Sequence, residues 1–178
     1  MNDFREISPY ELTGNPMTMI GKDWMLVSAA DSSCDTTFGK SYNTMTASWG
    51  GVGVLWNKPV AFVFIRPERN TFLFTEKSDH MTLSFFGGER RDMLTFCGRH
   101  SGRDTDKVAE CGLTPVFENE NEGRSVYFEE ACCVLKVRRL YADSIKTDSF
   151  YDNAPLDFYR TDGLHKMYIC EIEKVLVK

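Results

Sequence analysis

The sequence predicts a mainly β protein, built on an antiparallel sheet with a short helical insertion. Apolar and polar residues alternate with a period of two over most of the chain, which is the pattern of strands. Helical spacing of apolar residues is confined to residues 89–112. Because a sheet of roughly six or more strands usually removes its exposed edges by closing, we expect a barrel.

The first half of the predicted sheet begins with "WMLVSAA" at 24–30. The polar stretch at 31–43, rich in Asp, Ser and Gly, predicts a loop. Residues 43–51, "NTMTASWGG", alternate again and end in two glycines. After a glycine-rich turn, "VAFVFIRP" at 60–67 is apolar on both faces, which predicts a central strand covered on both sides.

Two more strands are predicted before the helical insertion, "TFLFT" at 71–75 and "HMTLSFFG" at 80–87. Apolar residues then recur at helical spacing in "ERRDMLTFCGRHSG" at 89–102, which predicts a first short helix.

The segment "DTDKVAECG" at 104–112 predicts a second short helix, with Asp104 as its N-cap and Gly112 as its stop.

Strands resume at residue 125 and continue to the carboxyl end of the chain. "SVYFEEACCVLKVRRLYAD" at 125–143 and "LHKMYICEIEKVLVK" at 164–178 are the last predicted strands. In the first of these, alternation places one set of residues toward the core: Ala131, Cys133, Leu135 and Val137. The aromatic-rich segment at 148–163 between them predicts a surface connection.

Length and charge narrow the functional classes. A chain of 178 residues suits a single domain spanning 1–178. A formal net charge of -5 argues against nucleic-acid binding, which needs a basic surface. No apolar run approaches the roughly 20 residues of a membrane span, and the acidic, proline-containing start is unlike a signal peptide. We therefore expect a cytoplasmic protein that neither crosses nor binds a membrane.

The cysteines and histidines predict neither a disulfide framework nor a metal site. The six cysteines are Cys34, Cys97, Cys111, Cys132, Cys133 and Cys170. Without an export signal they are expected to be reduced, and without C-x-x-C or clustered histidines no zinc site is expected. Adjacent residues of a strand point to opposite faces, so Cys132 and Cys133 should not form a redox pair, and Cys133 is expected in the core.

The alternation in "NTMTASWGG" places three hydroxyls on one face: Thr44, Thr46 and Ser48. A half-buried strand whose polar face meets water explains this pattern, and so does a face that binds a polar ligand. The sequence leaves both interpretations open.

Two charged stretches can likewise be interpreted either as ordinary structure or as an anion-binding site. "IRPERNTFLF" places Arg66 and Arg69 between two predicted strands, either as a solvated hairpin or as an anion contact. In "CGRHSGRDTDK", backbone amides at 105–107 attract an anion such as phosphate, unless the Asp104 side chain satisfies them. Dinucleotide fingerprints, P-loops and nucleophile elbows are not found in the sequence.

Five blocks in a fixed order carry a resemblance to a known family: "NTMTASWGG", "KPVAFVFIRPERNTFLF", "MTLSFFG", "FCGRHSGRDTDKVAECGLTP" and "HKMYICEIEKV". Over roughly residues 20–178 the chain resembles the flavin reductase-like proteins, especially their flavoredoxin-like branch. The resemblance implies an FMN-binding split β-barrel, antiparallel and of Greek-key type, with short helical insertions.

The resemblance also implies where FMN would bind. The flavin ring and ribityl side would meet Asn43, Thr44, Met45, Thr46, Ala47, Ser48 and Trp49. The ribityl and phosphate contacts would come from Lys58, Pro59, Arg66, Arg69 and Thr71. Ser101, Gly102, Arg103 and Lys107 would form a further element on the phosphate side or at the pocket rim. His165 matches a family histidine placed near the flavin and the nicotinamide approach, which makes it the candidate catalytic residue.

Two functions follow from the resemblance. One is an NAD(P)H-dependent flavin reductase, and the other is a flavoredoxin-type electron carrier with permanently bound FMN and a protein redox partner. A barrel that has lost its flavin is a third alternative, against which Arg69, Thr71 and the 44–49 block argue. Family members are usually homodimers, and the 149–159 segment is expected at that contact or over the ring. The chain departs from the family pattern at Asn70, Met81 and Cys170.

Overall fold

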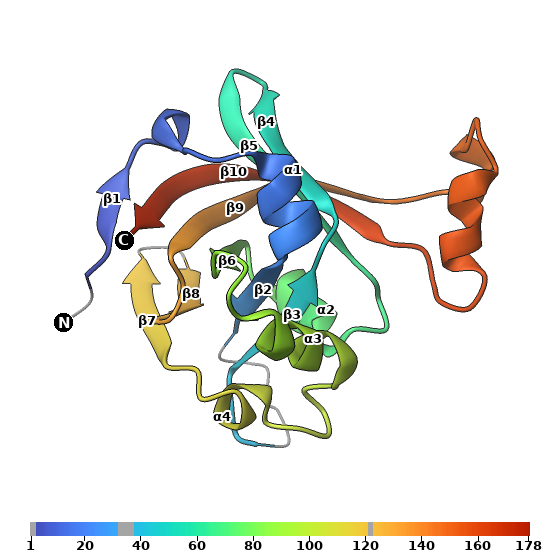
Figure 1. Ribbon diagram of the computed structural model, residues 1–178. Helices are drawn as coiled ribbons and strands as arrows, with labels where there is room; N and C mark the ends of the chain where they lie inside the picture. Colours follow the sequence, from blue (N-terminus) through green and yellow to red (C-terminus); the bar gives the residue numbers. More distant parts are fainter. Residues whose placement is uncertain (1–2, 32–37, 121–122) are drawn as a thin grey trace.

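The computed structural model describes residues 3–31, 38–120 and 123–178, so Cys34 and the rest of 32–37 in the predicted loop at 31–43 lie outside the described residues. Its main feature is an eight-stranded antiparallel sheet (Figure 1). The sheet consists of β1 (Arg5–Ile7), β2 (Met25–Ala30), β3 (Tyr42–Ala47), β4 (Gly50–Leu55), β5 (Lys58–Ile65), β6 (His80–Phe85), β9 (Cys133–Ser144) and β10 (Lys166–Val177). The predicted mainly antiparallel β fold with short helices is confirmed.

The strand order explains how the chain returns on itself. The strands pair in the order β3-β2-β6-β9-β10-β5-β4, and β1 adds to β10. The two end strands, β3 and β4, follow each other in the sequence and are joined by Ser48 and Trp49. In the described part of the chain they share no ladder, so this short link, and not a complete ring of strand pairs, connects the two ends of the sheet.

The sheet packs two hydrophobic clusters, one on each face of its central strands. Val27, Leu83 and Leu135 belong to the cluster inside the curved sheet, whereas Leu26 and Val134 belong to the cluster outside it. Neighbouring residues thus point to opposite clusters, which is why all six residues of β2 are buried. Cys133, Leu135 and Val137 lie in the inner cluster, as predicted.

A two-stranded hairpin, β7 (Pro115–Glu120) and β8 (Gly123–Phe128), covers the outer cluster. The sequence predicted that strands resume at 125, so β7 was missed. The prediction of one continuous strand over 125–143 is wrong, because a turn separates β8 from β9. Ala131, in this turn, packs in the outer cluster and not beside Cys133.

The predicted strand at 71–75 is also wrong, because these residues belong to α2 (Asn70–Lys77). Its buried residues are Asn70, Thr71, Phe74 and Thr75, and the spacing of three and four from Thr71 matches a helix. Phe72 and Phe74 mimic the alternation of a strand in so short a segment. The packing of α2 against β2 and β3 separates the two patterns.

Both helices of the insertion form, with one change of boundary. α3 (Arg91–Arg99) buries Leu94 and Cys97. α4 is Lys107–Glu110, and its N-cap is Asp106, whose side chain accepts a hydrogen bond from the Ala109 amide. The predicted cap at Asp104 is therefore wrong.

The remaining helical turns are short. They are α1 (Pro16–Thr18), a π turn at Met19–Asp23, and 3-10 turns at Pro9–Glu11, Thr147–Ser149 and Ala154–Tyr159. Residues 147–159 form an arm that projects from the body of the molecule between β9 and β10 (Figure 1).

None of the described helices has the length and apolar character needed to span a bilayer.

Candidate functional site

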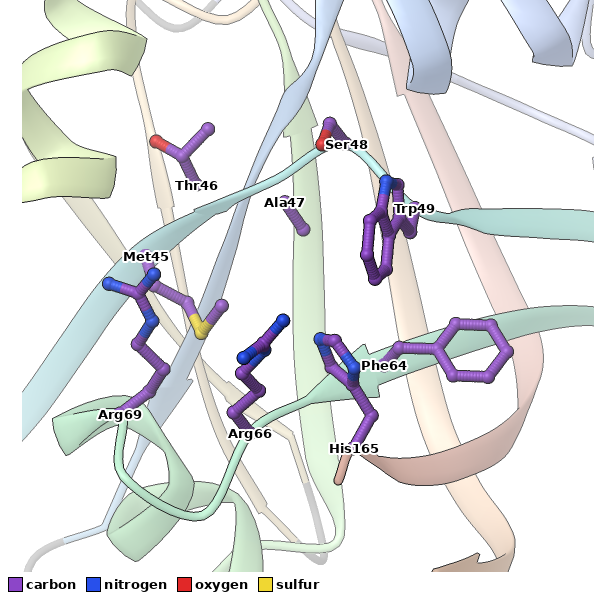
Figure 2. Close-up of a pocket in the computed structure, with 9 residues that line it drawn as sticks. All are labelled: Met45, Thr46, Ala47, Ser48, Trp49, Phe64, Arg66, Arg69 and His165. Carbon is purple, nitrogen blue, oxygen red and sulfur yellow. The ribbon is translucent and has the colours of Figure 1, made fainter. Parts of the chain in front are cut away.

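A cavity of about 160 Å³ opens where β3 ends and β5 turns toward α2 (Figure 2). Its lining residues come from separate parts of the chain: Met45, Thr46, Ala47, Ser48, Trp49, Phe64, Arg66, Arg69 and His165. The 45–49 segment lies opposite a row formed by Arg69, Arg66 and His165. We call this cavity the main pocket because Arg66, Arg69 and His165 line it; hollows of about 360 and 570 Å³ elsewhere on the described surface are larger.

The hydroxyls of β3 do not form one open face. The Thr44 hydroxyl is buried and lies 2.9 Å from the Ser28 hydroxyl. The Thr46 hydroxyl donates to the Leu94 carbonyl of α3 at 2.5 Å. Helix α3 therefore covers much of the row, and Thr46 and Ser48 are the two hydroxyl residues that reach the main pocket.

Arg69 lies at the positively polarised start of α2. It is the N-cap residue of this helix, and no side chain caps the helix there. One guanidinium nitrogen donates to the Gly98 carbonyl at 2.8 Å, which aims the side chain along the pocket wall. Arg103 donates to the Glu68 carbonyl at 3.2 Å and adds a second exposed guanidinium close by. Helix start and cations together favour an anion.

Arg66 is held by the base of the arm. Its Nη2 donates to the Phe158 carbonyl at 2.9 Å, and its Nη1 lies 2.8 Å from an Asp162 carboxylate oxygen. This buried Nη1 nevertheless makes no hydrogen bond of good geometry within the described residues. Arg66 therefore adds a positively charged side chain, paired with Asp162, to the lining of the main pocket.

His165 directly precedes β10 and is buried against aromatic rings. Its Nδ1 lies 3.2 Å from the Tyr159 hydroxyl, and its ring centroid is 5.2 Å from that of Trp49. Burial lowers the pKa of His165 to about 4, and the positive charge of Arg66 adds to this effect. The imidazole is therefore uncharged at neutral pH, with one nitrogen that donates a hydrogen bond and one that accepts.

No protein-family model and no curated protein matches the sequence. Solved structures do match. Flavoredoxin of Desulfovibrio vulgaris (Miyazaki F) is 22% identical, with a TM-score of 0.63 over 87% of this chain and 69% of that chain. An FMN-binding domain of a flavin reductase-like enzyme from Shewanella baltica is 15% identical, with a TM-score of 0.65 over 99% of this chain and 78% of that chain.

A third similar structure is the FMN-binding protein from Thermus thermophilus with bound 1-cyclohex-2-enone. It is 20% identical, with a TM-score of 0.58 over 95% of this chain and 79% of that chain. The chain has the split-barrel fold of the flavin reductase-like proteins. The fold that the sequence resemblance implies is thereby confirmed.

The split barrel places several of the predicted site residues outside the main pocket. Asn43 donates to the Thr71 hydroxyl at 3.1 Å, so these two buried side chains fasten β3 to α2. Gly102 packs so closely on Asn43 that an added Cβ would lie 2.3 Å from its amide oxygen. Asn43, Thr44, Gly102 and Lys107 line a second cavity of only about 20 Å³.

Lys107 is a buried structural cation of the split barrel. Its ammonium group donates to the Thr44 carbonyl and, at 3.2 Å, to the Cys97 carbonyl. Burial lowers the pKa of Lys107 to about 8. The predicted anion site on the amides at 105–107 also loses its basis, because the helix begins at Lys107 and Asp106 caps it.

The other predicted contacts lie at the edges of the split barrel. Lys58 and Pro59 begin β5, opposite Leu55 and Val54, and Lys58 pairs with Glu171. Ser101 accepts a hydrogen bond from the Arg103 amide. All of these residues lie outside the lining of the main pocket.

Phe64 lines the main pocket but was not among the predicted site residues. The sequence predicted β5 as covered on both faces, which is wrong, because Phe62 and Phe64 are only partly buried. Tyr159 was predicted only as part of the 149–159 segment, at a dimer contact or over the ring, and its hydroxyl lies against His165. The alternation of Phe62 and Phe64 with the buried Val63 and Ile65 is the signal that could have identified a partly open face.

Proposed function

We propose that this protein is a flavoprotein that binds FMN in the main pocket. The observation that carries the proposal is the convergence of an apolar wall, two arginines and an uncapped helix start in one cavity. The solved structures from Shewanella baltica and Thermus thermophilus with the same fold are described as FMN-binding.

The residues present fit the three parts of FMN. Met45, Ala47 and the partly exposed Trp49 and Phe64 offer apolar surface suited to a flat ring system. The start of α2 with Arg69 offers backbone and guanidinium donors suited to a phosphate dianion. The guanidinium of Arg66, which lines the main pocket and pairs with Asp162, adds positive charge beside the flavin.

We propose further that the protein acts as an NAD(P)H-dependent flavin reductase. FMN held by the 45–49 segment and Arg69 would supply the redox chemistry, the transfer of hydride from NADH or NADPH to the flavin and of electrons onward. The chain supplies binding, orientation and partial exclusion of water, and no side chain has to act as a base. His165, uncharged at neutral pH and oriented by Tyr159, is placed to donate a hydrogen bond to the nicotinamide or the flavin.

An electron carrier of flavoredoxin type is the second candidate. The similarity to flavoredoxin of Desulfovibrio vulgaris favours it, since that structure matches over most of this chain. In this case FMN would stay bound and a redox partner protein would replace the nicotinamide.

One experiment separates the two candidates. The purified protein, loaded with FMN, is followed by absorbance between the near ultraviolet and the blue under anaerobic conditions, first with NADH and then with NADPH. Rapid bleaching by either nucleotide supports the reductase and identifies its donor. Flavin bands that persist with both nucleotides but bleach with dithionite contradict the reductase and favour the carrier.

We also propose that the protein is a homodimer in solution. The arm at 147–159 stands away from the body of the molecule (Figure 1), and its Tyr151 and Phe158 are exposed. Phe158 contacts Trp49 with ring centroids 5.3 Å apart, so a second copy on the arm would lie beside the main pocket. Light scattering coupled to size exclusion tests this, and a monomeric mass contradicts it.

A further inference from the structure

Cys97 and Cys111 form a thiol pair that the proposed flavin chemistry does not use. Their sulfur atoms lie 3.8 Å apart, in hydrogen-bonding contact, although the residues are 14 positions apart in the sequence. Cys97 belongs to the last turn of α3, and Cys111 is the C-cap of α4. Both are free thiols in this structure. The sequence drew attention to Cys132 and Cys133, whereas the fold brings this other pair together.

The geometry is close to that of a disulfide. A disulfide bond is about 2.0 Å long, so rotation of the two side chains has to bring the sulfurs closer by less than about 2 Å. Cys97 is fixed on α3, but Cys111 has left the helical conformation, with φ -90° and ψ 0°. Gly112 follows with φ 60°, a conformation that glycine adopts without strain. The chain at Cys111 can therefore adjust more readily than α3.

Solvent reaches one of the two thiols much more readily than the other. Cys97 is 1% exposed, whereas Cys111 is partly exposed, so a reagent in solution reaches Cys111 first. Burial raises the pKa of Cys97 to about 12 and also raises the pKa of Cys111, while the nearby Lys107 ammonium opposes both shifts. Oxidation at neutral pH is therefore slow, and it begins at the sulfur that solvent reaches.

We propose that Cys97 and Cys111 are a redox modification site, which a small-molecule disulfide such as oxidised glutathione converts into an intramolecular disulfide. The Cys111 thiol loses its proton, and its sulfur attacks one sulfur of the small disulfide, whose S–S bond breaks. One small thiol leaves with that proton. The Cys97 sulfur then attacks Cys111 Sγ and loses its own proton to the second small thiol that leaves. Two protein thiols are oxidised and one disulfide is reduced.

The cross-link would fasten the end of α3 to the end of α4, next to the main pocket. The Cys97 carbonyl accepts from Lys107, and the adjacent Gly98 carbonyl accepts from Arg69. The thiol pair is thus one peptide unit away from the carbonyl that orients a pocket arginine. The inference itself does not depend on the flavin, because it rests on the positions of the two sulfurs.

The test uses the full chain incubated with oxidised glutathione, alkylated and digested without reduction, and mapped by mass spectrometry. The expected product is a peptide pair joined through Cys97 and Cys111, with two hydrogen atoms lost and no glutathione retained. Cys132→Ser is the matched control, because Cys132 is exposed and lies outside the pair, and this variant should give the same linked peptides. Cys111→Ser should leave Cys97 reduced.

Two results would overturn the proposal. One is glutathione that stays attached to Cys111 while Cys97 remains reduced, which would show that the second sulfur cannot close the bond. The other is modification of the exposed Cys132 with Cys97 and Cys111 both unchanged. Both are read from the unsubstituted protein, so they do not depend on whether Cys111→Ser folds.

Discussion

Replacing Arg69 by alanine tests the most exposed cation of the main pocket. The substitution removes the guanidinium at the start of α2 and leaves the fold of the helix in place, because its buried residues, Asn70, Thr71, Phe74 and Thr75, are unchanged. One guanidinium nitrogen of Arg69 donates to the Gly98 carbonyl, and the other donors of the side chain remain available to a phosphate.

The size of the effect follows from the loss of charge-assisted hydrogen bonds. Such a contact contributes about 1.5–3 kcal/mol, which corresponds to an increase in the FMN dissociation constant of about 10- to 150-fold. Because Arg69 is exposed, salt screens part of this attraction, so the effect should be larger at low ionic strength. The dissociation constant is measured by titrating the protein into FMN and following flavin fluorescence at two salt concentrations.

Lys58→Ala is the matched control for charge. The sequence resemblance assigned both Lys58 and Arg69 to the ribityl and phosphate side, but Lys58 pairs with Glu171 outside the main pocket. Lys58→Ala should therefore leave FMN affinity close to that of the unsubstituted protein. The reasoning is refuted if Arg69→Ala binds FMN normally, or if Lys58→Ala loses as much affinity as Arg69→Ala.

Three further outcomes are expected. Trp49→Ala should weaken FMN binding by about 1 kcal/mol in the same titration, because it removes a partly exposed aromatic wall; unchanged affinity would place the ring elsewhere. The pKa of His165 falls from 6.5 to about 4 on folding, so as the pH is lowered the unfolded state is protonated before the folded state. The free energy of unfolding, measured in urea, should therefore decline as the pH drops from about 6.5 to 4. His165→Gln should flatten this decline, and an equal decline in both proteins would contradict the shift. Lys107→Met should lower the free energy of unfolding by about 2 kcal/mol, because two buried carbonyls lose their charged donor, and full stability would show that the ammonium group is dispensable.

Much of the sheet could be predicted from the sequence because its strands are long and alternate regularly. β2 and β10 were placed within a residue or two, since their apolar residues recur over their whole lengths. The segment at 71–75 was not, because five residues with Phe at 72 and 74 satisfy the strand and the helix pattern alike. Tertiary packing of Thr71 and Thr75 decides for the helix.

Part of the candidate site could be predicted from the sequence and part could not. The 45–49 segment, Arg66, Arg69 and His165 were identified from motif blocks, and the fold brings them into one pocket. Lys107 was assigned to the phosphate side or the pocket rim because it belongs to the block at 101–107 that resembles the family. Its burial depends on the Thr44 carbonyl of β3, which is 63 positions away in the sequence. The local sequence carries no sign of that contact, and the same is true of Cys97 and Cys111.

A crystal structure of the protein grown with FMN would show directly whether the main pocket holds the flavin. We expect flavin density along the 45–49 segment, with the phosphate at the start of α2 beside Arg69 and the ring against Trp49 and Phe64. Flavin bound elsewhere, or a protein that binds no FMN in solution or in the crystal, would contradict it.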